Sequence, residues 1–119
     1  MFTNELSFHQ IVGRVATVPE LKETKTGKKV LNFVLAYDSM HLTDNSGSHT
    51  SFLDISAWEK TAEIFEPLLF KGLQVMVNGE ITQRRWIDNE GKKRHTFQMS
   101  ADTIQITDPK FKPVFKEAA

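Results

Sequence analysis

The chain has 119 residues, of which 39% are hydrophobic and 25% are charged, and its formal net charge is zero. This length and composition are typical of a single soluble globular domain with a sizeable core. The absence of cysteine excludes a disulfide framework and a cysteine-based zinc site, and it fits a protein of the reducing cytosol. No apolar stretch approaches membrane-spanning length, and the N-terminus lacks the basic-then-apolar run of a signal peptide.

Positive charge is concentrated in two stretches although the net charge is zero. Residues 22–29 and 71–96 are both basic and both contain hairpin turn signals, whereas the segment 54–66 is acidic. Basic hairpins are typical of surfaces that bind a polyanion. They are equally typical of lysines that keep the edge of a sheet soluble.

The first half of the chain predicts strands separated by turns. The strands are expected at residues 6–16, 21–24, 30–37 and 52–57, and the turns or loops at 17–20, 25–28 and 44–48. Gly13 indicates a bend or bulge within the first strand. The third strand is apolar on both faces, so we expect it at the centre of a sheet.

One helix is predicted between residues 59 and 70. The apolar residues at helical spacing are Ala62, Phe65 and Leu69. Gly72 lies where a C-terminal cap is expected. Pro67 removes a backbone donor and clashes with the preceding turn, so the helix should be short and end or kink near Glu66.

More strands follow the helix. They are expected at residues 73–83, 94–99 and 103–107, with a hairpin turn at 88–91. From Asp108 onward, two prolines and a cluster of charge predict a loosely held tail. We therefore expect one domain over residues 1–108 and a short tail over 109–119. Strands with one inserted helix suit a small closed β-barrel.

Residues 51–58 alternate with period two, and successive strand side chains point to opposite faces. One set is Leu53, Ile55 and Ala57, and the other is Phe52, Asp54, Ser56 and Trp58. The first set is typical of a core. Two large aromatic residues therefore share the outer face with polar residues.

The strand at 73–83 repeats this arrangement. The residues of its inner face are Val75, Val77, Gly79 and Ile81, and Trp86 is in phase with the outer, polar set that includes Arg84. Aromatic side chains on a partly basic sheet surface indicate a platform for flat bases. The pattern is also consistent with rings that a second subunit or a loop covers, and with ordinary core packing where a bulge shifts the phase.

The sequence shows no motif of an enzyme or of a metal site. The histidines, which are scattered without metal-ligand spacing, are His9, His41, His49 and His95. Residues 26–29 resemble the end of a phosphate-binding loop but lack its upstream glycine and its helix. Nothing places a nucleophile or metal beside Asp54 and Glu59. We expect no cofactor, no metal and no catalytic activity.

Several motifs in order along the chain resemble the bacterial single-stranded DNA-binding protein (SSB) family. They are IVGRV at 11–15, VPELK at 18–22, Gly27 followed by NFVLA at 32–36, WEKTAE at 58–63, KG at 71–72, residues 75–79 and WIDNEG at 86–91. Their order and spacing over residues 5–107 make the resemblance specific. It implies an all-β OB-fold, a five-stranded Greek-key barrel with one short helix between strands 3 and 4 and a long hairpin extension.

The resemblance also implies a function. Such a protein binds single-stranded DNA without sequence preference and protects it during replication, recombination and repair, as a homotetramer or a dimer. The implied base-stacking residues are Phe52, Trp58, Trp86 and His41. The implied phosphate contacts are Arg14, Lys60, Lys71, Arg84, Arg85 and Arg94. We expect the neighbouring lysines of the same basic hairpin, Lys92 and Lys93, to contact phosphates as well.

Two departures from the family pattern affect the expected partners. The family usually carries a long tail with an acidic tip that recruits replication and repair proteins, and here the sequence ends in FKEAA at 115–119. Leu53 stands where the family often has a histidine near a subunit contact, which puts the details of assembly in doubt. The alternatives are a tail-less OB-fold accessory module of a replication-restart complex, acting mainly through protein contacts, and an RNA-binding OB protein.

Overall fold

The structure is a computed structural model that describes residues 7–44 and 47–110, with side chains described outside residues 40–48. Six strands and one short helix follow one another within these residues. They are β1 (His9–Val15), β2 (Glu20–Glu23), β3 (Lys29–Asp44), β4 (Gly47–Trp58), α1 (Glu59–Phe65), β5 (Gln74–Ile87) and β6 (Lys93–Ile106). Of the predicted tail, only its first two residues belong to the described part.

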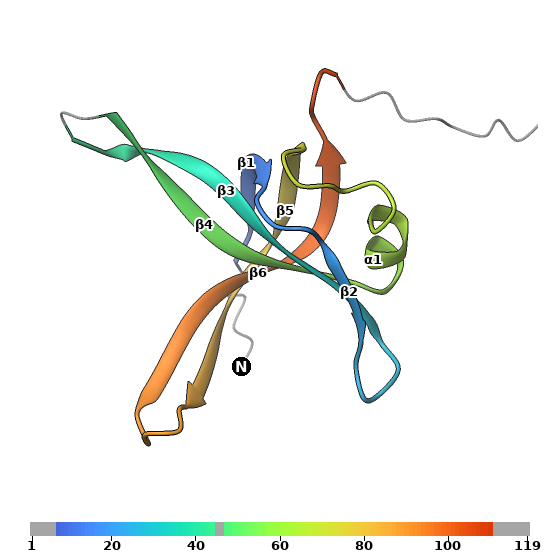
Figure 1. Ribbon diagram of the computed structural model, residues 1–119, viewed down its shortest axis with the longest axis vertical. Helices are drawn as coiled ribbons and strands as arrows, with labels where there is room; N and C mark the ends of the chain where they lie inside the picture. The colour runs from blue at the N-terminus through green and yellow to red at the C-terminus, as the bar shows by residue number, and fades with distance from the viewer. Residues whose placement is uncertain (1–6, 45–46, 111–119) are drawn as a thin grey trace, which may run out of the picture.

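Five of these strands close into a barrel (Figure 1). β1 pairs antiparallel with both β3 and β5, β3 pairs with β4, and β5 pairs with β6. A parallel pairing of β4 with β6 completes the ring. β2 pairs with the first residues of β3 outside the ring. The closed ring with one helix between its third and fourth strands is the OB-fold that the sequence predicts.

Alternate residues of the ring strands fill the barrel interior, as period-two patterning requires. The largest fully buried side chains are Val15, Leu31, Leu35, Ile55, Val75, Val77 and Met99 of these strands and Leu73 directly before β5. α1 adds Ala62 to this core, and Leu69 follows from the loop after the helix. Ile55 and Ala57 are buried, so the inner face predicted for β4 is confirmed.

The helix ends where Pro67 predicts. α1 stops at Phe65, and Glu66 is its C-terminal cap, with its amide donating to the Ala62 carbonyl. Gly72 does not cap the helix. It lies in the loop before β5 with φ of +99°, and its amide donates to the Val15 carbonyl at the end of the neighbouring strand β1.

The two strands expected at 94–99 and 103–107 are one continuous strand, β6. Its pairing with β5 shifts by one residue because Asn78 pairs with Thr103 while Gly79 pairs with Ala101. Asp102 is therefore the extra residue of a β-bulge, and it lies on β6. The alternation of β5 is uninterrupted, so the phase predicted from Val75 to Trp86 holds.

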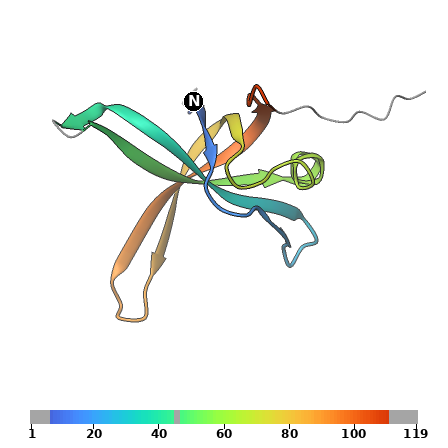
Figure 2. The ribbon, with the colours of Figure 1, turned by 45° about the horizontal axis from the view of Figure 1, so that its top comes forward.

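Three hairpins extend from the barrel in different directions (Figures 1 and 2). They are formed by β2–β3, β3–β4 and β5–β6. β3 and β4 run beyond the predicted 30–37 and 52–57 to form the second of these, and the predicted loop at 44–48 falls partly outside the described residues. In the β5–β6 hairpin, residues 83–87 and 93–95 are exposed whichever face they occupy.

Candidate nucleic-acid interface

One face of the sheet carries Phe52, Trp58 and Trp86. Asp54 of β4 pairs with Gln98 of β6, and Gln98 pairs with Thr82 of β5. Residues directly opposite one another across a strand pair share a face. Phe52 and Trp58 are in phase with Asp54, and Trp86 is in phase with Thr82. We call this surface the aromatic face.

The three rings are open to solvent. Phe52 is 66% exposed, Trp58 is 39% exposed and Trp86 is 41% exposed, whereas neighbouring Ile55 is buried. Core packing, one of the alternatives that the sequence leaves open, is therefore wrong for all three. The side chain of His41, the fourth predicted stacking residue, lies outside the described residues.

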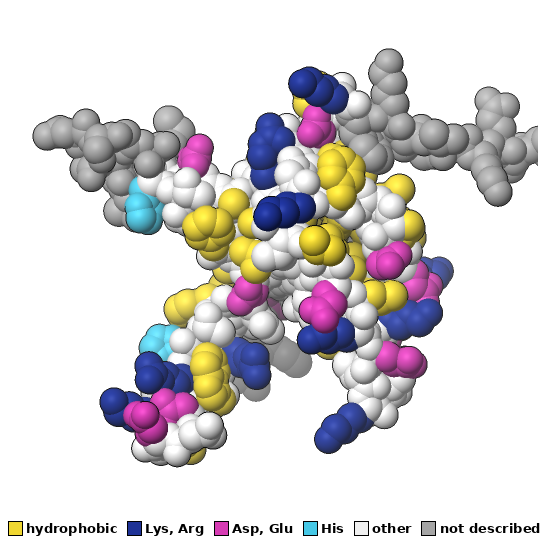
Figure 3. Space-filling view, in the orientation of Figure 1, with side chains coloured by type: hydrophobic (Ala, Val, Ile, Leu, Met, Phe, Trp, Pro, Cys, Tyr) yellow, Lys and Arg dark blue, Asp and Glu magenta, His cyan; other side chains and the backbone are white. Residues whose placement is uncertain are grey.

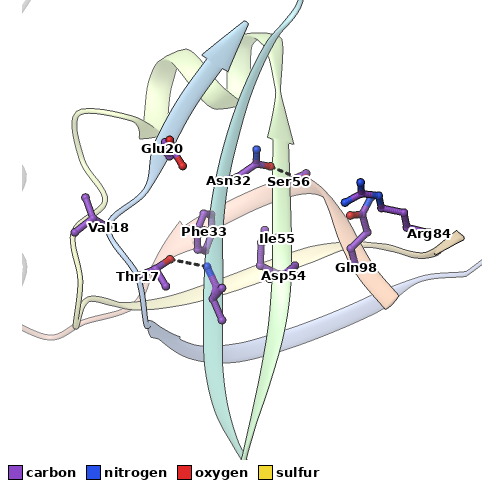
Figure 4. A pocket seen from close by; sticks show the side chains of 11 residues that line it. Thr17, Val18, Glu20, Asn32, Phe33, Asp54, Ile55, Ser56, Arg84 and Gln98 are labelled. Carbon is purple, nitrogen blue, oxygen red and sulfur yellow. Dashed lines mark hydrogen bonds between the residues drawn. The ribbon is translucent and has the colours of Figure 1, made fainter. Parts of the chain in front are cut away.

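A polar groove of about 450 Å³ crosses the aromatic face (Figure 4). Its lining comprises Thr17, Val18, Glu20, Asn32, Phe33, Val34, Asp54, Ile55, Ser56, Arg84 and Gln98. The Ser56 hydroxyl donates to Asn32 Oδ1 at 2.9 Å, and the Val34 amide donates to Thr17 Oγ1 at 3.0 Å. The groove therefore offers hydrogen-bonding side chains on the same surface as the rings. Sequence reasoning missed Asn32 and Gln98, since an isolated polar residue in a strand carries no motif.

Arg84 connects the groove to the hairpin. It lines the groove, and its Cζ atom lies 5.3 Å from the centroid of the Trp86 ring. A guanidinium at this distance forms a cation–π contact with the indole. The aromatic face thus combines a flat ring with an adjacent positive charge.

Asp88 organises the tip of the β5–β6 hairpin. Its carboxylate accepts hydrogen bonds from the amides of Glu90 and Lys92 and from Arg94 Nε, each at 2.9 Å. The bond from Arg94, followed by those from the backbone amides, lowers the pKa of Asp88 below its ordinary value. Gly91 completes the turn with φ of +79°, as the predicted turn at 88–91 requires.

The predicted phosphate-contacting cations are distributed over more than one surface. Arg84 and Arg94 belong to the aromatic face, whereas Arg85 and Lys93 are in phase with the opposite face of the hairpin. Lys92 lies in the turn, and basic side chains gather over this hairpin together with histidine, apolar and some acidic side chains (Figure 3). The hairpin is therefore basic on both faces.

The remaining predicted cations lie on the barrel. Lys60 is exposed in α1, and Lys71 is exposed in the loop before β5. Arg14 of β1 donates to the Gly72 carbonyl at 2.9 Å and lies 3.7 Å from an Asp108 carboxylate oxygen. Its charge is partly compensated within the protein.

Neither a metal site nor a membrane span is found in the described part of the chain. No three His, Asp or Glu side chains there gather to hold a metal ion. None of its helices is long and apolar enough to cross a membrane.

The fold and the surface together define an OB-fold module with an exposed aromatic face and a basic hairpin. Residues 7–107 match the single-strand binding protein family, and the chain belongs to that family. The family is not one of enzymes, in agreement with the sequence, which shows no catalytic motif.

Curated relatives and a solved structure are similar to this chain. It is 31% identical over 100 residues to single-stranded DNA-binding protein 2 of Listeria monocytogenes, covering 84% of this chain and 62% of the relative. It is 34% identical over 97 residues to the single-stranded DNA-binding protein of Treponema pallidum, covering 81% and 54% respectively. The chain thus spans about three-fifths or less of these relatives' length. A structure of the Plasmodium falciparum SSB complex with ssDNA superposes with a TM-score of 0.78 at 23% identity, covering 91% of this chain and all of the other, and it supports the fold.

Proposed function

We propose that this protein binds single-stranded DNA through the aromatic face, with little preference for base sequence. The observation that carries the proposal is the presence of three exposed rings, Phe52, Trp58 and Trp86, on one face of the barrel and its hairpin. Every base has a flat face, so stacking on such rings is tolerant of sequence and contributes about 1–3 kcal/mol per base. In a duplex the base faces are already stacked, so duplex DNA should bind much more weakly.

Phosphate contacts complete the proposed binding mode. Arg84 has its guanidinium beside Trp86, which supports a contact with a phosphate next to a stacked base. Lys92 and Lys93 extend this charge to the hairpin tip, and Lys60 and Lys71 add charge on the barrel. Backbone phosphates are alike in every sequence, so these contacts add affinity without specificity.

The biological role that we propose follows from the family. The relatives bear the name single-stranded DNA-binding protein. We propose on this basis that the chain protects exposed single strands during replication, recombination and repair in the cytoplasm. We propose that residues 1–108 form the binding domain and that it assembles as a homotetramer or a dimer.

The two tryptophans of the chain allow a direct test of stacking. In Trp58→Phe the fluorescence reports on Trp86 alone, and in Trp86→Phe it reports on Trp58 alone. We expect oligo-dT to quench the emission of both variants, and a duplex of the same length to quench neither at equal concentration. The double variant Trp58→Ala/Trp86→Ala should bind labelled oligo-dT more weakly in an anisotropy titration. Unchanged emission in both single-tryptophan variants, or unchanged affinity of the double variant, would refute the stacking assignment.

A further inference from the structure

The face of the β5–β6 hairpin opposite Trp86 carries exposed apolar and aromatic side chains outside the barrel. Three cross-strand pairs place its residues together, namely Gln83 with Phe97, Arg85 with His95 and Ile87 with Lys93. Phe97 is 54% exposed and Ile87 is 68% exposed. We call these six residues the back face.

Along β5 and β6, the residues of the back face have the same alternation as the core residues, but they lie beyond the end of the core. Ile81, which is partly buried, pairs with the buried Met99 of the core, and Gln83 and Phe97 are the next pair in the same phase. From the sequence, Phe97 would therefore be taken for a core residue. The hairpin leaves the barrel at this point, so its ring faces solvent instead.

The side chains of the back face are held in place by one another. The rings of His95 and Phe97 meet edge to face with centroids 6.1 Å apart. Arg85 Nε donates to Gln83 Oε1 at 2.8 Å, which fixes the guanidinium on this face. A flat ring and a fixed cation side by side are the same combination that Arg84 and Trp86 present on the aromatic face.

The two faces are connected around the hairpin. A hollow of about 570 Å³ is lined by Arg85, Ile87 and His95 of the back face together with Trp86 and Arg94 of the aromatic face. β1 pairs with β5 only as far as Gly79, and β4 pairs with β6 only from Gln98 onward. In the described part of the chain, both edges of the hairpin beyond these points have no neighbouring strand.

The charge of the back face indicates a polyanionic occupant. Its charged residues are Arg85 and Lys93, and it carries no carboxylate. Asp88, at the tip, is in phase with Trp86 and is bound by Arg94. Cations interspersed with flat rings fit the alternating phosphates and bases of a single strand.

We propose that the back face is a second contact surface for single-stranded DNA and that Phe97 stacks a base there. One strand would contact Trp86, cross an edge of the hairpin and continue over Phe97, so that the hairpin is enclosed by the strand. This inference rests on the proposed function and deepens it.

A single-tryptophan reporter tests the contact in the full chain. The variant Trp58→Phe/Trp86→Phe/Phe97→Trp has its only indole on the back face. We expect quenching by oligo-dT of about 35 nucleotides, which exceeds the ~4–16 nucleotides covered by one OB-fold. Binding is followed independently by the anisotropy of labelled oligo-dT. Saturated binding without a change in emission would overturn the inference, whereas absence of binding by the wild type would overturn the proposed function itself.

Two conservative variants separate stacking from apolar contact. Phe97→Leu keeps an apolar side chain but removes the flat ring, and Phe97→Tyr keeps the ring. We expect Phe97→Leu to weaken binding of the long oligo-dT about 5- to 150-fold, the loss of one stacked base, and Phe97→Tyr to bind within about twofold of wild type. Equal affinities for both variants and the wild type would contradict the inference. The inference is also wrong if the back face is instead a contact between copies of the chain. In that case Phe97→Leu would bind DNA normally, and the Ile87→Asp/Phe97→Asp variant would have a lower molar mass than the wild type in light scattering.

Discussion

Gly79 is the position at which a single methyl group should most disturb the geometry that links barrel and hairpin. A Cβ on residue 79 would lie 2.1 Å from the Ser100 carbonyl oxygen, 2.9 Å from the Ser100 carbonyl carbon and 3.0 Å from Ala101 Cα. All three are backbone atoms of β6, so no side-chain rotation can relieve the contact. In Gly79→Ala, β6 must therefore move away from β5 beside the Asp102 bulge.

The expected cost follows from the bonds that such a movement breaks. Overpacking of a well-packed site costs about 1–3 kcal/mol. Separation of β5 from β6 at this point also weakens about two strand-pairing hydrogen bonds, each worth about 1 kcal/mol. We therefore expect Gly79→Ala to lower the free energy of unfolding by about 3–5 kcal/mol, a large share of the ~5–15 kcal/mol typical of a domain.

Urea unfolding followed by circular dichroism measures this loss, with Gly91→Ala as the matched control. Gly91 has φ of +79°, and a Cβ there would have no atom within 4 Å apart from those of its chain neighbours. The alanine variant therefore introduces backbone strain without a steric clash. That strain costs about 1–2 kcal/mol. A loss for Gly79→Ala no larger than that for Gly91→Ala would refute the close-approach argument. If the fold survives, oligo-dT affinity should also fall, because the hairpin that carries Trp86 is displaced.

Two further predictions concern carboxylates near the proposed strand path. Asp54→Asn removes a negative charge from the aromatic face, so it should tighten oligo-dT binding about two- to fivefold at low salt. The gain in affinity should be lost at high salt, where the charge is screened. An unchanged low-salt affinity in anisotropy titrations would contradict a strand path over this residue. Asp88 has a folded-state pKa below its unfolded value, so it stabilises the hairpin tip above the ordinary aspartate pKa of 3.8 and loses this effect as pH falls through the lowered pKa. The protection factor of the Lys92 amide, which donates to the Asp88 carboxylate, should therefore fall at acid pH in the wild type and be low already at neutral pH in Asp88→Asn. Equal protection factors of the two proteins at neutral pH would count against this role.

The orientation of the stacking residues could be predicted from the sequence because it is a local property. In β4, the alternation of Leu53, Ile55 and Ala57 with Phe52 and Trp58 fixes which side chains face outward. In β5 the same argument reaches Trp86 correctly only because the bulge falls on Asp102 of the partner strand. A bulge on β5 itself would have reversed the assignment.

The groove and the back face could not be predicted, because they depend on pairing between distant strands. The parallel pairing of β4 with β6 brings Gln98 opposite Asp54, and nothing local to either strand specifies that partner. Phe97 has the phase of a core residue, and only the point at which the hairpin leaves the barrel exposes it. The bulge at Asp102 also made one strand resemble two, since it interrupts the apolar pattern of β6.

The salt dependence of binding distinguishes the predicted phosphate contacts from those already satisfied within the protein. Of the eight predicted cations, Arg14 is paired with Asp108 and Arg94 with Asp88. If the other six contact phosphates, log affinity per chain should fall with log salt at a slope of about −4, whereas eight contacts would give about −6. Asp88→Asn releases Arg94 and should steepen the slope by about 0.7. Titration of oligo-dT at several salt concentrations measures both slopes. A wild-type slope near −6 that Asp88→Asn leaves unchanged would show that the ion pairs open on binding, and the division into free and compensated cations would be wrong.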